Sequence, residues 1–156
     1  MRVKGELTFS DEIVENFKID FQNLTHNSGQ MVWMWDNFKV TCEIEVDTDK
    51  HVMADIIKQI KENPTQDTYY QSARYLQEQG KDQQDALSYL DMAEIIGGPT
   101  YYIYRVRALV LAQQERYEEA IQAAEESKVL AAIEGKDEFV RLNENSIEDW
   151  KVLIRN

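Results

Sequence analysis

The sequence predicts an α+β protein in which a small antiparallel β-sheet of three or four strands is followed by an α-α superhelix of about six helices. Two observations support this prediction. Apolar side chains recur at every second position in the first third of the chain, and they recur at helical spacing after residue 47. This change of period divides the chain into a sheet segment, residues 1–47, and a helical domain, residues 48–156.

The strand prediction is clearest for residues 38–46, where apolar and polar side chains alternate without exception. Residues 31–35 are strongly apolar and precede Asp36-Asn37, a pair that tolerates the backbone of a tight hairpin turn. These two segments are therefore predicted to form a hairpin. Further strands are indicated by alternation at Phe17, Ile19 and Phe21 and at Val3, Leu7 and Phe9.

Six helices are expected, each bounded by residues that start or stop a helix. Asp47-Thr48-Asp49 can cap the first helix, which ends before Asn63-Pro64. The second covers about residues 67–79, and Gly80 can adopt the left-handed conformation after it. The others are expected from the cap Asp82 to Ile96, from Tyr101 to Gln114, from Tyr117 to Glu134, and along Phe139, Leu142, Ile147, Trp150 and Leu153.

The third and fifth helices form a repeat. Ala86 aligns with Ala120 at an offset of 34 residues, the period of the tetratricopeptide repeat. Small side chains allow two helices to approach closely, so alanines at a fixed spacing mark a contact line. Residues 117–120, Tyr-Glu-Glu-Ala, also resemble that repeat, whereas its Leu-Gly pair is replaced by Ser72-Ala73 and Arg107-Ala108. The helical domain is therefore predicted to be tetratricopeptide-like, with its first and last helices as covers.

Five segments together resemble the C-terminal half of a bacterial family, the domain of unknown function 2911 family. They are residues 17–21, residues 32–35, the Val46-Asp47 junction, residues 69–80 and residues 140–144. The resemblance implies a β-sandwich followed by tetratricopeptide-like helices, in an exported or periplasmic protein with no established activity. It also implies that this chain begins inside the sandwich, as a fragment of a longer protein, and it supplies no catalytic residues.

Charge and composition exclude several partners. The net charge of -12 disfavours nucleic acid and anionic membrane surfaces, because both attract lysine and arginine. No apolar run approaches the roughly 20 residues that cross a bilayer, so no membrane insertion is expected. The expected partner is a protein or peptide.

Residues that could carry chemistry are few. Cys42 is the only cysteine and lies on the apolar side of its predicted strand, where a buried structural thiol is expected. His26 lies in a polar turn and His51 in the first turn of a helix, and both are expected to face solvent. No phosphate-binding loop, calcium loop or zinc spacing is present. No catalytic residue, metal site or cofactor is therefore predicted.

A peptide-binding groove is the one candidate site. In a tetratricopeptide-like stack the first helix of each hairpin lines a concave groove, and arginine binds carboxylates with two hydrogen bonds. The alternative is that the tyrosines are core residues and the arginines pair with acids of the third or sixth helix. Trp33 and Trp35 are expected to pack helices against the sheet, with a ligand platform as the alternative. The candidate groove residues are Tyr70, Arg74, Gln77, Tyr102 and Arg105.

These features favour a non-catalytic protein-interaction or scaffolding module of unknown partner. One alternative is a structural part of a larger exported β-sandwich protein whose ligand or active site lies upstream. A second alternative is an uncharacterised hydrolase. An unpaired sheet edge is further expected to be covered by a second copy, because exposed edges recruit strands.

Overall fold

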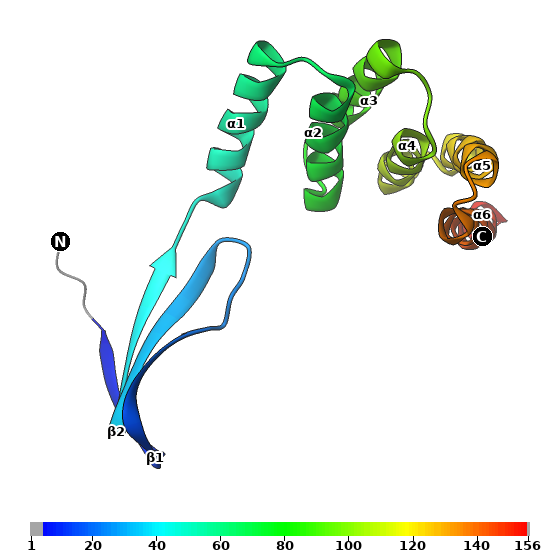
Figure 1. The fold of residues 1–156 in the computed structure, drawn as a ribbon. Helices are drawn as coiled ribbons and strands as arrows, with labels where there is room; N and C mark the ends of the chain where they lie inside the picture. The colour runs from blue at the N-terminus through cyan, green and yellow to red at the C-terminus, as the bar shows by residue number, and fades with distance from the viewer. Residues whose placement is uncertain (1–4, 156) are drawn as a thin grey trace. The chain divides into compact units, whose positions relative to one another are not determined.

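The computed structural model describes residues 5–155 and confirms the α+β class, with a two-stranded antiparallel sheet followed by six helices (Figure 1). The chain forms two compact units, residues 1–55 and residues 56–156, and each is described by itself. The first unit contains the sheet and the beginning of the first helix. The second contains the remaining helices.

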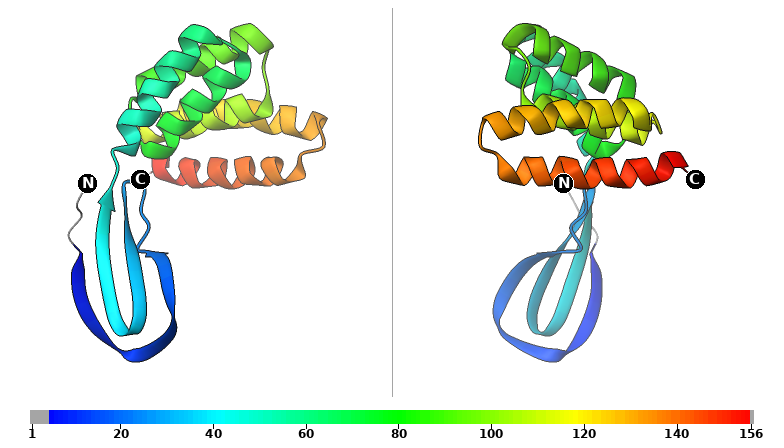
Figure 2. Two further views of the ribbon diagram at one scale, coloured as in Figure 1. Left: turned by 60° about the vertical axis from the view of Figure 1, so that its left-hand side comes forward. Right: turned by 90° about the vertical axis from the view of Figure 1, so that its right-hand side faces the viewer.

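Strand β1 covers Glu6–Gln22 and strand β2 covers Ser28–Glu45. An extended strand of 18 residues would be roughly 60 Å long, yet the Val46 N–H donates a hydrogen bond of 2.8 Å to the Asn27 carbonyl. The two ends of β2 therefore meet, and Figure 2 shows its two limbs running side by side. Asp36 has a φ of 53°, the left-handed backbone expected of the predicted turn.

Strand β1 bends around this turn of β2. Residues 6–9 pair with residues 38–41, and residues 18–22 pair with residues 30–34, with shifts of register on either side of Val14. Strand β2 is one element on both sides of the left-handed turn at Asp36, so the described residues contain two long strands where the alternation predicted three or four. Val3, which the alternation also placed in a strand, lies outside the described residues.

The helices follow the order that the sequence predicts. Helix α2 is capped by the Thr65 hydroxyl, which accepts a hydrogen bond of 3.1 Å from the Thr68 N–H, and it ends at Gly80, whose φ is 62°. Asp47 caps the first helix by accepting from the Lys50 N–H at 3.1 Å. The bounds are α1 Thr48–Glu62, α2 Gln66–Gln79, α3 Gln83–Gly97, α4 Tyr101–Gln113, α5 Tyr117–Ile133 and α6 Asp137–Arg155.

Asp82 is a correction to the predicted caps. It occupies the position before α3, but its φ is 41° and its side chain makes no capping hydrogen bond. The left-handed backbone turns the carboxylate away from the orientation that an N-cap requires, because a capping residue has an extended backbone. The start of α3 is therefore correct, and the reason given for it is wrong.

Small buried residues lie where the helices of the second unit meet. Helix α2 packs on α3, α4 on α5, and α5 on α6. The repeat-related residues Ala86 and Ala120 are both 0% exposed, as are Ala73 and Ala108. A methyl group at each of these places leaves room for the neighbouring helix, so a longer side chain there has no free volume to occupy.

We expect Ala120→Leu to destabilise the protein by about 1–3 kcal/mol, because extra methylene groups in a packed interior force neighbours apart. Ala132→Leu is the matched control, since it makes the same change at an exposed position of the same helix. Urea unfolding followed by far-ultraviolet circular dichroism measures both. Equal effects of the two substitutions would show that Ala120 is not a point of close helix contact.

Candidate functional site

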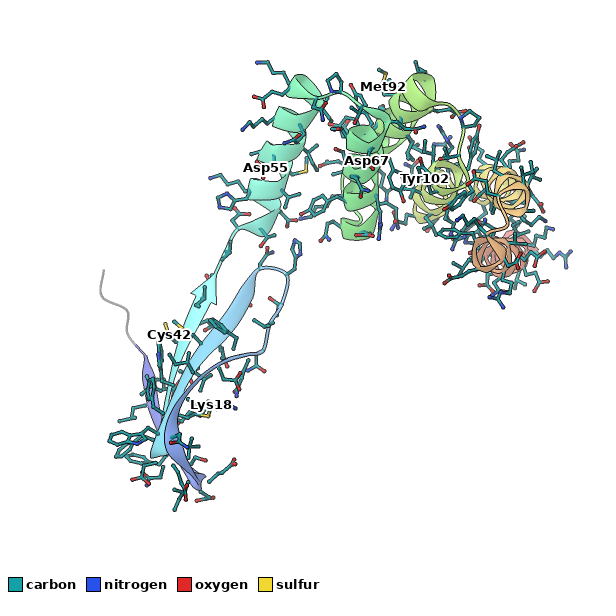
Figure 3. All side chains as sticks on the ribbon, in the orientation of Figure 1. Lys18, Cys42, Asp55, Asp67, Met92 and Tyr102 are labelled. Carbon is teal, nitrogen blue, oxygen red and sulfur yellow. The ribbon has the colours of Figure 1, made fainter. Side chains whose placement is uncertain are left out.

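The five predicted groove residues lie on α2 and α4, and the aromatic rings of two of them are in direct contact. The rings of Tyr70 and Tyr102 meet edge to face with their centroids 4.7 Å apart. Tyr102, labelled in Figure 3, also donates from its hydroxyl to Gln66 Oε1 at 3.5 Å. Burial is the main reason that the pKa of Tyr70 is raised. This tyrosine pair is half-buried, so it packs α2 against α4 and also forms part of the surface.

Arg74 is open to solvent, and Gln77 contacts the neighbouring helix α4. Arg74 Nε donates to Glu78 Oε1 at 2.7 Å, and the Arg74 side chain remains 51% exposed. That hydrogen bond is the main cause of the raised pKa of Arg74. Gln77 accepts at its carbonyl from Gln113 Nε2 at 3.0 Å. Arg74 pairs within its own helix, and not with an acid of α3 or α6.

Arg105 differs from Arg74 because helix α6 already uses its guanidinium. Its Nη1 donates to Asn143 Oδ1 at 3.1 Å, to Ser146 Oγ at 3.0 Å and to the Leu142 carbonyl at 3.3 Å. Burial lowers the pKa of Arg105. The partners of Arg105 are neutral groups of α6. The structure therefore does not show the alternative in which Arg105 pairs with an acid.

A buried hydrogen-bond chain continues from this contact and links three helices. Asn143 Nδ2 of α6 donates to Ser127 Oγ of α5 at 2.8 Å, and Ser127 Oγ donates to the Tyr101 carbonyl of α4 at 2.7 Å. Asn143 and Ser127 are both 0% exposed. Buried polar groups without partners are costly, so this chain fixes α6 in one register against α4 and α5.

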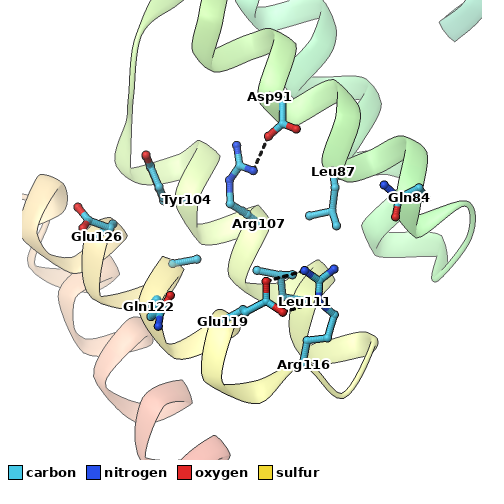
Figure 4. Close-up of a pocket in the computed structure, with 11 residues that line it drawn as sticks. Gln84, Leu87, Asp91, Tyr104, Arg107, Leu111, Arg116, Glu119, Gln122 and Glu126 are labelled. Carbon is cyan, nitrogen blue, oxygen red and sulfur yellow. Dashed lines mark hydrogen bonds and ion pairs between the residues drawn. The ribbon is translucent and has the colours of Figure 1, made fainter.

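A groove that the sequence did not predict lies among α3, α4 and α5. It has a volume of about 480 Å³ (Figure 4). Its floor includes the apolar side chains of Leu87, Leu111 and Ala123, and its walls are polar. The residues that line it are Gln84, Leu87, Asp91, Tyr104, Arg107, Leu111, Arg116, Glu119, Gln122, Ala123 and Glu126.

Arg107 is the central cation of this groove. It donates to Asp91 Oδ1 at 2.5 Å and to Glu94 Oε2 at 3.0 Å, and its guanidinium lies 5.7 Å from the centre of the Tyr104 ring. The Tyr104 hydroxyl donates to Glu94 Oε1 at 2.7 Å, which is the main reason that the pKa of Tyr104 is raised. Both carboxylates thus neutralise Arg107, although its buried Nε has no acceptor among the described residues.

Arg116 closes one end of the groove in a two-pronged pair with Glu119. Its Nε and Nη2 donate to the two carboxylate oxygens of Glu119 at 2.7 and 2.6 Å. The pKa of Glu119 is lowered chiefly by its hydrogen bond with Arg116. This pair is largely exposed, so its contribution to stability is small. The pair gives Arg116, the second arginine of the groove, a carboxylate partner.

Among the described residues, Glu126 is the charged residue of the groove lining that has no ion-pair partner. Within residues 5–155, no group donates a hydrogen bond to its carboxylate and no cation pairs with it. In and beside the groove, the four carboxylates of Asp91, Glu94, Glu119 and Glu126 face two guanidiniums, which leaves an excess of two negative charges. The groove therefore offers hydrogen-bond acceptors and negative charge above an apolar floor.

The other residues considered from the sequence carry no comparable site. Cys42 is buried, as predicted, with 4% exposure. His26 was expected to be merely solvated, but its Nε2 lies 3.3 Å from Asp49 Oδ1. Within the described part of the chain, no three histidine, cysteine or acidic side chains are grouped so that they could hold a metal ion. None of the described helices is both long and apolar enough to span a bilayer.

The groove could have been suspected from Arg107 alone. Its neighbours Val106, Ala108 and Val110 are buried core residues, so an arginine among them needs partners from another helix. Comparisons of the chain with models of protein families, with curated proteins and with solved structures find no match. The site is therefore interpreted from its own geometry.

We expect Arg105→Met to destabilise the protein by about 1–3 kcal/mol, because it leaves the buried Asn143 Oδ1 without a donor. Arg74→Met, at the exposed pair with Glu78, is expected to change stability by less than about 0.5 kcal/mol. Chemical denaturation of both variants tests this. A large loss for Arg74→Met and none for Arg105→Met would reverse our assignment of the two arginines.

Proposed function

We propose that the protein is a non-catalytic protein-interaction or scaffolding module that binds a basic peptide segment in the groove among α3, α4 and α5. The observation that supports this most directly is Glu126, an acceptor with no donor at the edge of a groove that has an apolar floor. The two arginines of the groove already have carboxylate partners, so the charge left for a ligand is negative.

Lysine is the side chain that fits this arrangement best. Its aliphatic stem packs on apolar surface while its ammonium group stays hydrated and charged. In the groove the stem would lie on Leu87, Leu111 and Ala123, and the ammonium group would donate to Glu126. A volume of about 480 Å³ exceeds one side chain, so a short segment of the partner would be held.

We further propose that the helices form a tetratricopeptide-like superhelix. The offset of 34 residues between Ala86 and Ala120, both fully buried, supports this arrangement. The surface of Tyr70, Arg74, Gln77 and Tyr102 would then be a second contact for a peptide. The main role we assign to Arg105 there is to hold α6, because its Nη1 donates to Asn143 and Ser146.

We expect Glu126→Gln to weaken binding of a lysine-containing peptide roughly two- to fivefold, the effect of one exposed charge pair. The probe is a fluorescein-labelled peptide with lysines at every third position among alanines. Its affinity is measured by fluorescence anisotropy at low ionic strength. The same peptide with glutamates in place of the lysines should not bind.

Glu118→Gln is the matched control for this experiment. Glu118 is exposed on the same helix, outside the groove, and its substitution changes the net charge by the same amount. An effect confined to Glu126→Gln supports the groove. Equal weakening by both substitutions would mean that the peptide responds only to overall charge, and the proposed site would be wrong.

A structural role is the second candidate, and the exposed apolar side chains of the sheet favour it. Phe9, Phe17 and Trp35 are 68%, 62% and 61% exposed, which is unusual for large apolar groups. In this alternative the sheet is one layer of a β-sandwich, as the resemblance to the domain of unknown function 2911 family implies. The chain would then belong to an exported or periplasmic protein.

A further inference from the structure

The sheet has one face that is almost entirely apolar. Residues directly opposite each other in an antiparallel pair point to the same side, and four such pairs are apolar on both strands. Charged and polar residues of β1, such as Glu6, Thr8 and Asp20, alternate with them and point to the other side. The apolar pairs are Leu7 with Val40, Phe9 with Phe38, Ile19 with Trp33, and Phe21 with Met31. We call this side of the sheet the apolar face.

Much of the apolar face is exposed. Seven of its large residues are more than 40% accessible: Leu7, Phe9, Phe17, Ile19, Phe21, Trp35 and Phe38. At 150–250 Å² for each aromatic side chain, these exposed fractions amount to roughly 800 Å². A single protein rarely exposes a contiguous apolar patch of this size to water.

We propose that the apolar face packs against the same face of a second copy, so that two sheets form a two-layer β structure across a two-fold axis. The exposed area of roughly 800 Å² is what each partner contributes to a stable interface of standard size. Two-fold dimers use one surface twice, and such a surface must be complementary to itself.

Charge limits which surface two copies of the chain can share. The chain carries a net charge of -12, so two copies repel each other over most of their surfaces. None of the paired residues on the apolar face is charged. Contact through this face is therefore the arrangement that brings two copies together with the least repulsion.

Packing face to face is favoured over pairing edge to edge. Strand β1 lies at an edge of the sheet and carries Glu6, Lys18 and Asp20, with Lys18 and Asp20 paired at 3.4 Å. Charged side chains on an edge strand oppose the addition of another strand. The expectation of a homodimer is thus kept, and its contact surface moves from the edge to the face.

The two ends of the apolar face differ in a way that suits a two-fold axis. At one end lies a hollow of about 270 Å³, lined in part by Phe21, Leu24, Ile44 and Val46. At the other end, beside the turn of β2, Trp35 is 61% exposed. A two-fold axis that lies between the two sheets, parallel to them and perpendicular to the strands, sets the Trp35 end of each copy over the hollow of the other.

Sedimentation equilibrium on the chain of 156 residues tests this proposal. We expect a dimer whose dissociation constant rises at least about 100-fold in Phe9→Glu, because a carboxylate would be buried in an apolar layer. Thr8→Glu, which adds the same charge to the opposite face of the same strand, should leave the dimer intact. Trp35→Glu is a second dissociating variant should Phe9→Glu fail to fold, which circular dichroism reveals.

Three results would overturn the proposal. A monomeric unsubstituted chain that binds no hydrophobic dye would mean that the chain covers its own face. A monomer that binds the dye strongly would mean that the apolar face is exposed and that its partner is a different protein. A dimer disrupted by Thr8→Glu as much as by Phe9→Glu would place the contact elsewhere. Because the groove lies in the helical unit, none of these results decides the peptide-binding proposal.

Discussion

Close approach between helices at buried alanines is the constraint on which the second unit depends. Ala73, Ala86, Ala108 and Ala120 are all fully buried, and each allows a neighbouring helix to lie against the backbone. Because the helices lie this close together, longer side chains fit only at the margins of the helix–helix contacts. Arg107 can then reach carboxylates on α3, and Arg105 can reach acceptors on α6. The charged groove and the buried polar chain both follow from the same tight packing.

The two arginines of α4 show how identical chemistry takes different roles. Arg105 and Arg107 are two positions apart, so they leave opposite sides of the helix. Arg105 meets neutral acceptors and serves to hold α6 in register. Arg107 meets two acids and leaves its surroundings negatively charged overall. The charge of Arg107 is already neutralised by two carboxylates, and this is why the partner proposed for its groove is basic.

Local patterns predicted much of the fold, and contacts between distant residues account for what they missed. Alternation and helix-ending residues place the strands and all six helices, because both depend on neighbours in the chain. The described sheet has two long strands, and the predicted three or four are not confirmed, because the turn at Asp36 does not divide β2. Of the candidate site, the sequence predicted that Tyr70 and Tyr102 are neighbours, but it could not show that Arg105 faces α6 or that α3 supplies acids to Arg107. Those partners lie 13 to 41 residues away.

Cys42 gives the sheet unit a chemical reporter of its own. It is the only thiol in the chain and is 4% exposed, so a thiol reagent can modify it only when the strands around it separate. The rate of modification therefore follows opening of the sheet alone, while the helices contain no reactive sulfhydryl to confuse the signal. One residue thus allows the two units of a single chain to be compared without cutting them apart.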